Sequence, residues 1–412
     1  MLKRFRAWLG QVGEDLREST DPSLLSSLRF LGLLYGPIDR KLPIDQALRK
    51  AWGRRLPAFV GWRHSFGGIA YLLFMVLVAT GVLLSFYYRP SVDEAYASLQ
   101  YISTEVPFGW LVRDVHVWSA NLIVLAILAH MARVFFTGAY RPPRETSWLV
   151  GVLLLFVVMA FGGTGYLLPW DQWAYWTATE VMDVIRRMPI LGGAIAGLLT
   201  GDQFVSGATL SRFFALHVIV LPWAAFGLLV LHFVVVRKHG TAQPKGYVET
   251  GSPGTPFYPD HLLRMVIVSA LVLAIAISLA AVFPRPVGDP ATPFEVPGGL
   301  VSSWIVVDVS LGLIRTLGVW GFVGFTALGL LLVILPLVDR EADTPLRRKP
   351  VVLGVGLLFF LGFLAFWAVG RQIDSVPPSA EVERRILEER AIPTPDVPAA
   401  DVGSAPEARQ EP

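Results

Sequence analysis

The stretch VHVWSANLIVLAILAH, Val115–His130, places two histidines 14 positions apart in an almost wholly apolar run. A histidine in the hydrocarbon of a membrane is costly, so each one is a functional candidate. A second apolar run has the same form, with His217 and His232 15 positions apart. The interpretation of the whole chain depends on what these four histidines bind.

The chain is too apolar for a soluble protein of its length. Its 412 residues are 54% hydrophobic and 16% charged, with a mean hydropathy of +0.55, and soluble domains carry more charge. Seven apolar runs are near the length that crosses a bilayer. They are residues 67–87, 115–136, 148–168, 213–236, 265–283, 318–338 and 351–370. The sequence therefore predicts an all-α polytopic membrane protein with seven transmembrane helices, and short surface helices within 180–200.

Lysine and arginine predict the orientation. Residues 1–66 hold 12 of them, and the loops after the second, fourth and sixth spans hold 2, 4 and 4, against 2, 3 and 2 in the opposite loops. Cytoplasmic loops carry the excess of positive charge. We therefore expect an inner (cytoplasmic) membrane protein with a cytoplasmic N-terminus and an extracytoplasmic C-terminal tail. Because the basic residues follow the loops, we expect no nucleic-acid partner.

The two histidine pairs fit two facing helices. At about 100° per residue, 14 steps return to within about 40° of the start and 15 steps to within about 60°, so each pair shares one helix face. The helices run in opposite directions, which matches His116 with His217 at the outer side and His130 with His232 at the inner side. Facing imidazoles can supply both axial ligands of a haem iron. A purely structural role for all four, or zinc, fits less well, because no carboxylate or thiolate is near.

Two glycine pairs repeat the same spacing. Gly67 and Gly81 are 14 apart in the first span, and Gly151 and Gly165 are 14 apart in the third. A porphyrin edge against a helix needs the Cβ removed, which glycine provides, although glycine also serves ordinary helix packing in membranes. Together the pairs predict two stacked, non-covalent b-type haems, and the absence of cysteine excludes thioether attachment.

Three arginines are candidates for the haem propionates. Arg113 and Arg133 each lie three residues beyond a predicted ligand, and Arg212 lies near the outer end of the fourth span. The alternative is that these cations extend to lipid headgroups at the interface.

These features resemble a known family. The segments 88–135, GTGYLLPWDQWAYW (163–176) and 211–240 closely resemble cytochrome b of the quinol–cytochrome c and plastoquinol–plastocyanin oxidoreductases, and PWDQ is typical of the cytochrome b6 branch. Further on, TPFYPDHLL (255–263), GDPATPFE (288–295) and LRRKPVV (346–352) resemble subunit IV of the b6f complex. The expected division is 1–62 as a cytoplasmic amphipathic segment, 63–240 as the haem-binding bundle, 241–371 as the subunit IV-like part and 372–412 as a disordered tail.

The resemblance implies a function and partners. Quinol is oxidised at the outer face, one electron goes to a Rieske iron–sulfur protein and on to a c-type cytochrome, and the other crosses both haems to an inner quinone site. It also implies a homodimer within a larger complex, a quinone pool and lipid contact. At the inner site, a family aspartate corresponds to His261, beside Asp260.

The sequence departs from the family at two places. The family's outer motif Pro-Glu-Trp-Tyr, anchored on Trp304, reads SSWI here, so Ser303 replaces the glutamate that takes a quinol proton. Asp308, one turn beyond Trp304, is the candidate substitute; the alternative is an aspartate solvated at the membrane surface. Ser65 stands where the b6 branch attaches an extra haem through cysteine, and neighbouring His64 is expected to be interfacial.

Two other functions stay open. A haem-wire subunit that passes electrons without splitting the pair is favoured by the lost glutamate, whereas the retained GYLLPWDQ favours the quinol oxidoreductase. A transporter would need polar groups along a path, and the spans show almost none beyond the histidines.

Overall fold

The computed structural model describes residues 55–243, 254–295, 304–341 and 349–371. The predicted N-terminal segment up to residue 54, the tail 372–412 and Ser303 lie outside the described residues. Compact packing divides the chain into two units. In the smaller one, β1 (Arg55–Leu56) pairs antiparallel with β2 (Thr255–Pro256), and the π-helix η3 (Phe257–His261) leads into α12 (Leu262–Val282), of which only the residues up to Ile267 belong to this unit.

Seven helical stretches of the described chain are long and apolar enough to cross a membrane, as predicted. They are α4 (Phe66–Ser85), α6 (Gly109–Phe136), α7 (Glu145–Leu167), the continuous stretch Gly207–His239, α12, α13 (Ile305–Val338) and α14 (Pro350–Arg371). The stretch Gly207–His239 consists of α10 (Gly207–Ala215), the π-helix η2 (Leu216–Val220) and α11 (Leu221–His239). The all-α polytopic fold is confirmed.

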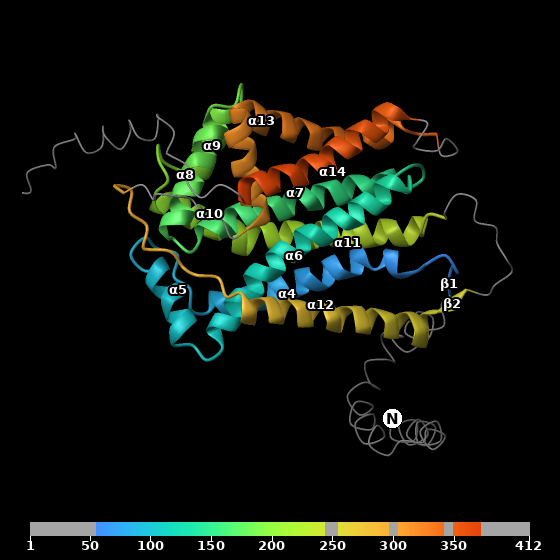
Figure 1. The fold of residues 1–412 in the computed structure, drawn as a ribbon, viewed down its shortest axis with the longest axis horizontal. Helices are drawn as coiled ribbons and strands as arrows, with labels where there is room; N and C mark the ends of the chain where they lie inside the picture. Colours follow the sequence, from blue (N-terminus) through green and yellow to red (C-terminus); the bar gives the residue numbers. More distant parts are fainter. Residues whose placement is uncertain (1–54, 244–253, 296–303, 342–348, 372–412) are drawn as a thin grey trace, which may run out of the picture. The chain divides into compact units, whose positions relative to one another are not determined.

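The larger unit contains the predicted four-helix bundle. Helix α4 packs on α6, α6 on α7, and α7 on α11, while α13 and α14 pack on each other and add to the α6–α7 side (Figure 1). Three further helices, α5 (Ala95–Thr104), α8 (Gln172–Arg186) and α9 (Gly192–Thr200), gather at one end. Short helices are therefore present within 180–200 as expected, but of α8 and α9 only α9 is largely exposed, because α8 is buried. We name this the outer end, after the predicted orientation, and the opposite one the inner end.

Several predicted boundaries are wrong; the fourth span, for example, begins at Gly207, six residues before the predicted 213. Helix α6 begins at Gly109, six residues before the predicted span, so Arg113 is helical. Residues 305–317, which the sequence left outside any span, form the first arm of α13. Gly318, with φ +62°, ends this arm by a bend that glycine allows. The backbone breaks its direction there, and the apolar pattern alone does not reveal the bend.

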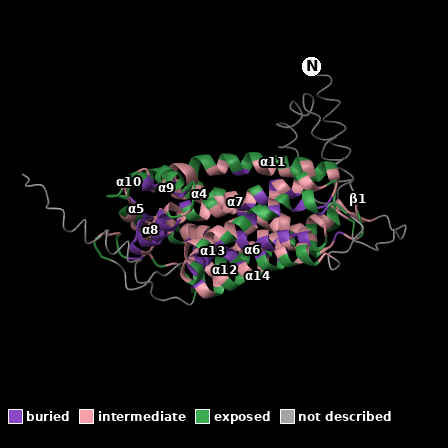
Figure 2. Cartoon of the chain, turned by 90° about the horizontal axis from the view of Figure 1, so that it is seen from above, coloured by how far each residue is buried: buried purple, intermediate pink, exposed green. Residues whose placement is uncertain are grey.

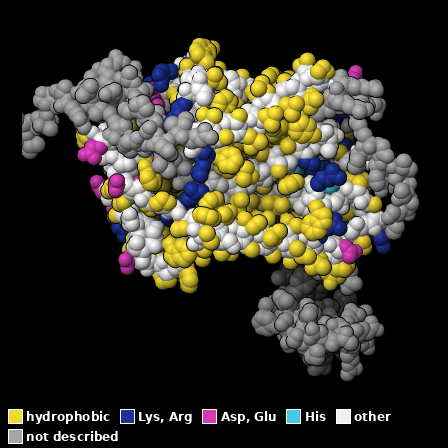
Figure 3. Space-filling view, viewed as in Figure 1, with side chains coloured by type: hydrophobic (Ala, Val, Ile, Leu, Met, Phe, Trp, Pro, Cys, Tyr) yellow, Lys and Arg dark blue, Asp and Glu magenta, His cyan; other side chains and the backbone are white. Residues whose placement is uncertain are grey.

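The exposure of apolar side chains matches that of helices surrounded by lipid. Helix α8 is buried on nearly all sides, whereas α11 exposes apolar side chains along its length (Figure 2). In the space-filling view apolar side chains cover the middle of the face, and Lys and Arg gather in two groups on either side of it (Figure 3). This pattern suits helices whose outer faces meet lipid.

A buried ionic cluster joins the two predicted parts at the inner end. Asp339, at the end of α13, is 1% exposed and accepts hydrogen bonds from the Tyr140 hydroxyl, from Arg141 Nε at 2.8 Å and from Lys349. Burial by itself raises the pKa of Asp339, but these hydrogen bonds and the charge of Arg141 outweigh it and hold the pKa below its ordinary value. The carboxylate therefore stays ionised between two cations.

Candidate haem and quinol sites

His116 of α6 and His217 of η2 face each other at the outer end. Their ring centroids are 6.3 Å apart. Two imidazoles that share one metal ion through bonds of about 2 Å have ring centroids roughly 6 Å apart. The observed separation therefore fits two axial ligands of one iron, with no movement of either helix.

Hydrogen bonds orient both rings. Nδ1 of His217 lies 3.0 Å from the carbonyl oxygen of Phe161 and 3.2 Å from Thr164 Oγ1. Nδ1 of His116 lies 2.8 Å from Thr80 Oγ1. Because a carbonyl only accepts, the proton of His217 belongs on Nδ1, which leaves Nε2 as the ligating nitrogen. Such partners typically fix the tautomer and angle of a metal-bound histidine.

The π-helix η2 explains the unequal histidine spacing. A π turn holds one residue more than an α turn, and this one contains His217. The 15 positions from His217 to His232 therefore rotate like the 14 from His116 to His130. Pro222 follows η2 closely, and its missing N–H removes one bond of the regular ladder, which suits a π turn at this place.

The inner pair lines a cavity. His130 of α6 and His232 of α11 contribute to a pocket of about 330 Å³, whose wall comes from α4, α6, α7 and α11 and is largely apolar. Nδ1 of His130 is buried and has no hydrogen-bond partner among the described residues, whereas His232 lies close enough to the Ser147 backbone to interact with it. Buried unsatisfied polar atoms are costly, and a flat apolar group with a polar edge suits such a cavity.

Each predicted glycine faces one predicted histidine. A Cβ on Gly67 would lie 3.2 Å from the His130 ring, and one on Gly81 3.3 Å from His116. On α7 the same distances are 3.7 Å from Gly151 to His232 and 2.5 Å from Gly165 to His217. The spacing of the glycines therefore matches the spacing of the histidines because each glycine makes room for one imidazole ring.

We expect the tightest of these contacts to be sensitive. Gly165→Ala puts a methyl group 2.5 Å from the His217 ring, so the ring must turn and the outer haem should be lost or its spectrum altered, at a cost of about 1–3 kcal/mol. Gly163→Ala, two residues away on α7, is the matched control because nothing lies within 4 Å of its Cβ. Reduced-minus-oxidised spectra of both variants check this, and equal spectra would contradict it.

The predicted propionate arginines have different surroundings. Arg113 Nη1 donates to the carbonyl of Arg285 at 2.8 Å and lies 3.2 Å from Asp114. Arg133 lines the inner cavity. Arg212 instead donates to the carbonyl oxygens of Gly197 and Leu198. Its guanidinium therefore binds the last turn of α9, a role that neither sequence-based interpretation included.

His64 lies at the mouth of the inner cavity. Its Nδ1 accepts a hydrogen bond from the Gly61 N–H at 3.2 Å. Burial, and then the charge of Arg133, lower the pKa of His64. The ring of His64 thus holds the turn that precedes α4, and its expected interfacial position stays a prediction.

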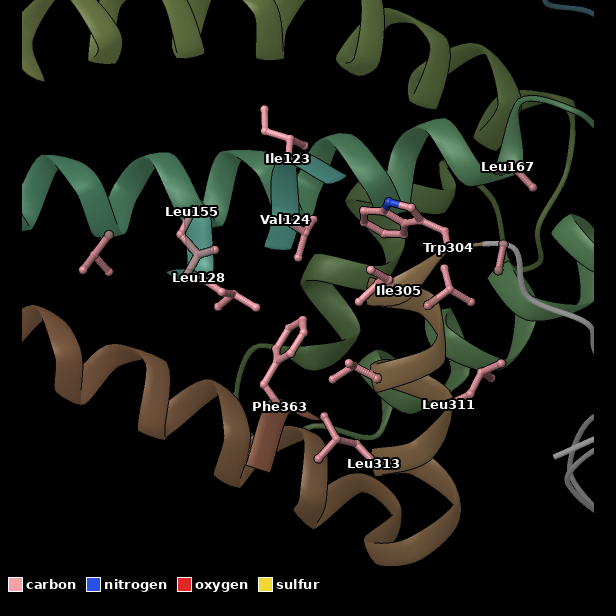
Figure 4. Close-up of a cluster of buried hydrophobic side chains, with 14 of the residues drawn as sticks. Ile123, Val124, Leu128, Leu155, Leu167, Trp304, Ile305, Leu311, Leu313 and Phe363 are labelled. Carbon is pink, nitrogen blue, oxygen red and sulfur yellow. The ribbon is translucent and has the colours of Figure 1, made fainter. Parts of the chain in front are cut away.

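Trp304 and Asp308 are both buried, so the alternative of a solvated Asp308 is wrong. The Trp304 indole fits a slot at Gly162 of α7, where an added Cβ would overlap the ring, and it points into the buried cluster with Val124 and Leu167 (Figure 4). The Asp308 carboxylate, 2% exposed, instead faces α14, with Arg371 Nε at 4.0 Å. The two side chains therefore meet different helices.

The inner quinone candidates belong to the smaller unit. Asp260 is exposed. His261 is half-buried, its ring lies tilted against that of Phe257 with centroids 5.8 Å apart, and its Nδ1 has no hydrogen-bond partner among the described residues. They remain adjacent in η3, as the sequence requires.

The sequence analysis missed Thr80 and Thr164, which orient the outer histidines. A usable signal exists, since each directly precedes an outer glycine, in ATGV (79–82) and GTGY (163–166). It also missed Asn121, whose side-chain oxygen accepts the Ile305 N–H at 2.9 Å and fixes the start of α13.

Comparisons with known proteins agree with this arrangement. The family model described as Cytochrome b/b6/petB matches residues 52–240. Cytochrome b6 of Synechococcus sp. is 41% identical over 211 residues, covering 51% of this chain and 98% of its own, and that of Synechocystis sp. is 46% identical over 189 residues, covering 46% and 85%.

A solved structure extends the likeness past the bundle. A chain of a hyperthermophilic respiratory Complex III matches with a TM-score of 0.72 and 28% identity, covering 86% of this chain and 94% of that one. The facing histidines, their glycines and these relatives show that the chain belongs to the cytochrome b/b6 family of membrane electron-transfer proteins, whose cofactor is haem b.

Proposed function

We propose that the chain is the di-haem cytochrome b subunit of a quinol oxidoreductase, acting with a Rieske iron–sulfur protein and a c-type cytochrome. Two histidine pairs, at the outer and inner ends of one bundle, carry the proposal. His116 and His217 would hold one b-type haem, and His130 and His232 the other. When bound, the two haems supply one-electron transfer between the two ends of the bundle.

The protein's own residues prepare both positions. Thr80 and the Phe161 carbonyl hold the outer imidazoles with Nε2 directed across the gap. Arg113 and Arg133, on α6, are placed to bind propionates at the two ends, whereas Arg212 is occupied by α9. The four glycines that leave room for the rings are Gly67, Gly81, Gly151 and Gly165.

The outer end is the proposed quinol site. Trp304 forms part of its wall, and Asp308 is the proton acceptor proposed from the sequence in place of Ser303. At the inner side, His261 and Asp260 are proposed to deliver protons to a quinone, since histidine titrates near neutral pH. A homodimer in the inner membrane, with the N-terminus cytoplasmic and the tail outside, completes the proposal.

The deciding measurement is oxidant-induced reduction of haem b in the purified complex, with quinol supplied and the inner site blocked. Haem b should become reduced only after the high-potential partner is oxidised. Haems that are present but never respond to oxidant would instead identify a haem-wire subunit. A complex without a b-type spectrum would contradict the assignment of the four histidines.

Asp308→Asn tests the proposed base. A general base typically contributes a factor of about 10²–10⁴ to the rate, so quinol oxidation should slow by at least about tenfold and be slowest at low pH. The haem spectrum should stay unchanged, because Asp308 faces α14 and not a histidine. Steady-state rates between about pH 5 and 9 check this, and a rate equal to that of the unmodified protein at every pH would assign Asp308 to helix packing alone.

A further inference from the structure

Two sets of buried polar atoms at the outer end have no explanation in the fold. All three guanidinium nitrogens of Arg315, on the first arm of α13, are buried without a hydrogen-bond partner among the described residues. The same holds for the hydroxyl oxygen of Thr177 on α8, a residue that is 2% exposed. Orphaned donors of this kind cost free energy and often indicate a functional site.

A buried carboxylate lies on the same helix as Thr177. Glu180 is 5% exposed and follows Thr177 by three residues, so both side chains are on one face of α8. Helix α8 packs on α13, and the charge of Glu180 acts on the Arg315 guanidinium. A hydroxyl, a carboxylate and a guanidinium therefore gather where these two helices pack.

Other charges near Glu180 are few in the described residues. Helix α13 brings Arg315 and, seven residues earlier, Asp308. Helix α9 has no titratable side chain, and α7 has only Glu145, at its inner end, and Tyr166. On α8 itself, Asp183 pairs with Arg187 at 3.0 Å. Arg315 is therefore the basic residue that α13 brings toward Glu180 in the described residues.

The hydrogen-bonding capacities of the three side chains indicate which kind of ligand they would bind. A carboxylate only accepts hydrogen bonds, a guanidinium only donates them, and a threonine hydroxyl does both. A phosphate or carboxylate would bind Arg315 but be repelled by Glu180. A phenolic hydroxyl can donate to Glu180 and, once deprotonated, accept from Arg315, which matches both partners.

We propose that Thr177, Glu180 and Arg315 bind a hydroxyl group of the quinol ring and that Glu180 accepts its proton. The inference rests on the proposed quinol oxidation. The hydroxyl O–H bond breaks, the proton moves to the Glu180 carboxylate, and the electron pair remains on the oxygen as a phenolate beside Arg315. Quinol releases two protons on oxidation, and this site supplies an acceptor separate from Asp308.

The position of the site supports this role. The same arm of α13 begins next to Trp304, whose indole lies against Gly162. Gly162 is three residues, less than one turn of α7, before Gly165, which faces His217. The first arm of α13 thus connects the surroundings of the outer histidine pair with α8. A base on α8 also offsets the loss of the glutamate at Ser303.

Glu180→Gln in the whole complex tests the proposal. Quinol oxidation should slow by about 10²-fold or more, with a changed pH profile, and Glu180→Asp should recover part of the rate. Thr177→Val should raise KM more than it lowers kcat. Asp183→Asn is the matched control, a buried acid one turn further on α8, and should keep the rate and pH profile of the unmodified protein.

Binding of a short-chain hydroquinone to the fully reduced complex, which has no electron acceptor left, provides a second readout that needs no turnover. Glu180→Gln should weaken hydroquinone binding at least about tenfold. This result is expected even if the unmodified protein does not send the two quinol electrons to different acceptors, so the binding experiment tests the site independently of the proposed function. Equal binding and equal rates in Glu180→Gln, or an equal loss in Asp183→Asn, would overturn the proposal. The proposal would also be overturned if removing lipid from the complex lowered the rate of quinol oxidation and phosphatidylglycerol vesicles restored it. That result would assign Arg315 to a lipid headgroup phosphate.

Discussion

His217→Leu is expected to remove one of two b-type haems and leave the other in place. Leucine keeps the apolar volume of the bundle but has no lone pair, so the ring of His116 would face it alone across the present 6.3 Å gap. The haem content should fall by about half, because one of the two ligand pairs is broken. A redox titration should lose one of its two steps, and quinol oxidation with oxidant-induced haem reduction should be abolished.

His239→Leu is the control for that experiment. This histidine ends the same continuous stretch, Gly207–His239, and also has a buried Nδ1 without a partner among the described residues, but it belongs to neither of the two facing pairs. Its haem content should match that of the unmodified protein. A His217→Leu variant that keeps both redox steps would refute the outer ligand pair.

Asp339→Asn is expected to be the most destabilising single change outside the haem ligands. It removes the charge that Arg141, which is 3% exposed, and Lys349 share in the buried cluster. Breaking a buried ionic pair from one side costs about 3–5 kcal/mol, because the remaining charges stay buried without compensation. Thermal loss of the haem spectrum in detergent should therefore occur at a clearly lower temperature.

The pH dependence of this effect has a definite sign. The folded protein holds the pKa of Asp339 below its ordinary value near 3.8, so the ionised carboxylate stabilises the fold above that pH. The stabilisation is lost as the pH falls through the lowered pKa. The difference between the unmodified protein and Asp339→Asn should accordingly be full at neutral pH and shrink in strong acid.

Glu341→Gln is the matched control for Asp339→Asn. Its carboxylate pairs with the same Lys349 at 3.3 Å, but its side chain is 75% exposed. Exposed pairs contribute about 0–1 kcal/mol, so the unfolding temperature should barely change. Equal destabilisation by both substitutions would show that burial of Asp339 is not what makes the cluster important.

Local patterns predicted most of the bundle. Seven apolar runs became seven long apolar helices, and the 14-residue periods of histidine and glycine placed each ring opposite one glycine. These features repeat along single helices, so counting along the chain is enough to find them. The family resemblance, quoted from the segments around His116, Pro169 and His217, was confirmed by the relatives.

Packing decided the remaining features. The sequence placed Asp308 beside Trp304, but Trp304 is extended and precedes the helix, so the two side chains turn toward α7 and α14. Glu180 and Arg315 are far apart in the chain and lie on two helices that pack together, α8 and α13. No local period encodes such packing, because it depends on how α8 and α13 meet.

The sequence by itself determined the membrane-spanning helices, the four histidines and the glycines that face them, because helical periodicity is a property of neighbouring residues. Only the tertiary structure decided that η2 makes 15 positions equivalent to 14, that Asp339 is buried between Arg141 and Lys349, and that Glu180 acts on Arg315. Each of these depends on backbone bends or on contacts between distant segments, where packing and the cost of burying charge select one arrangement.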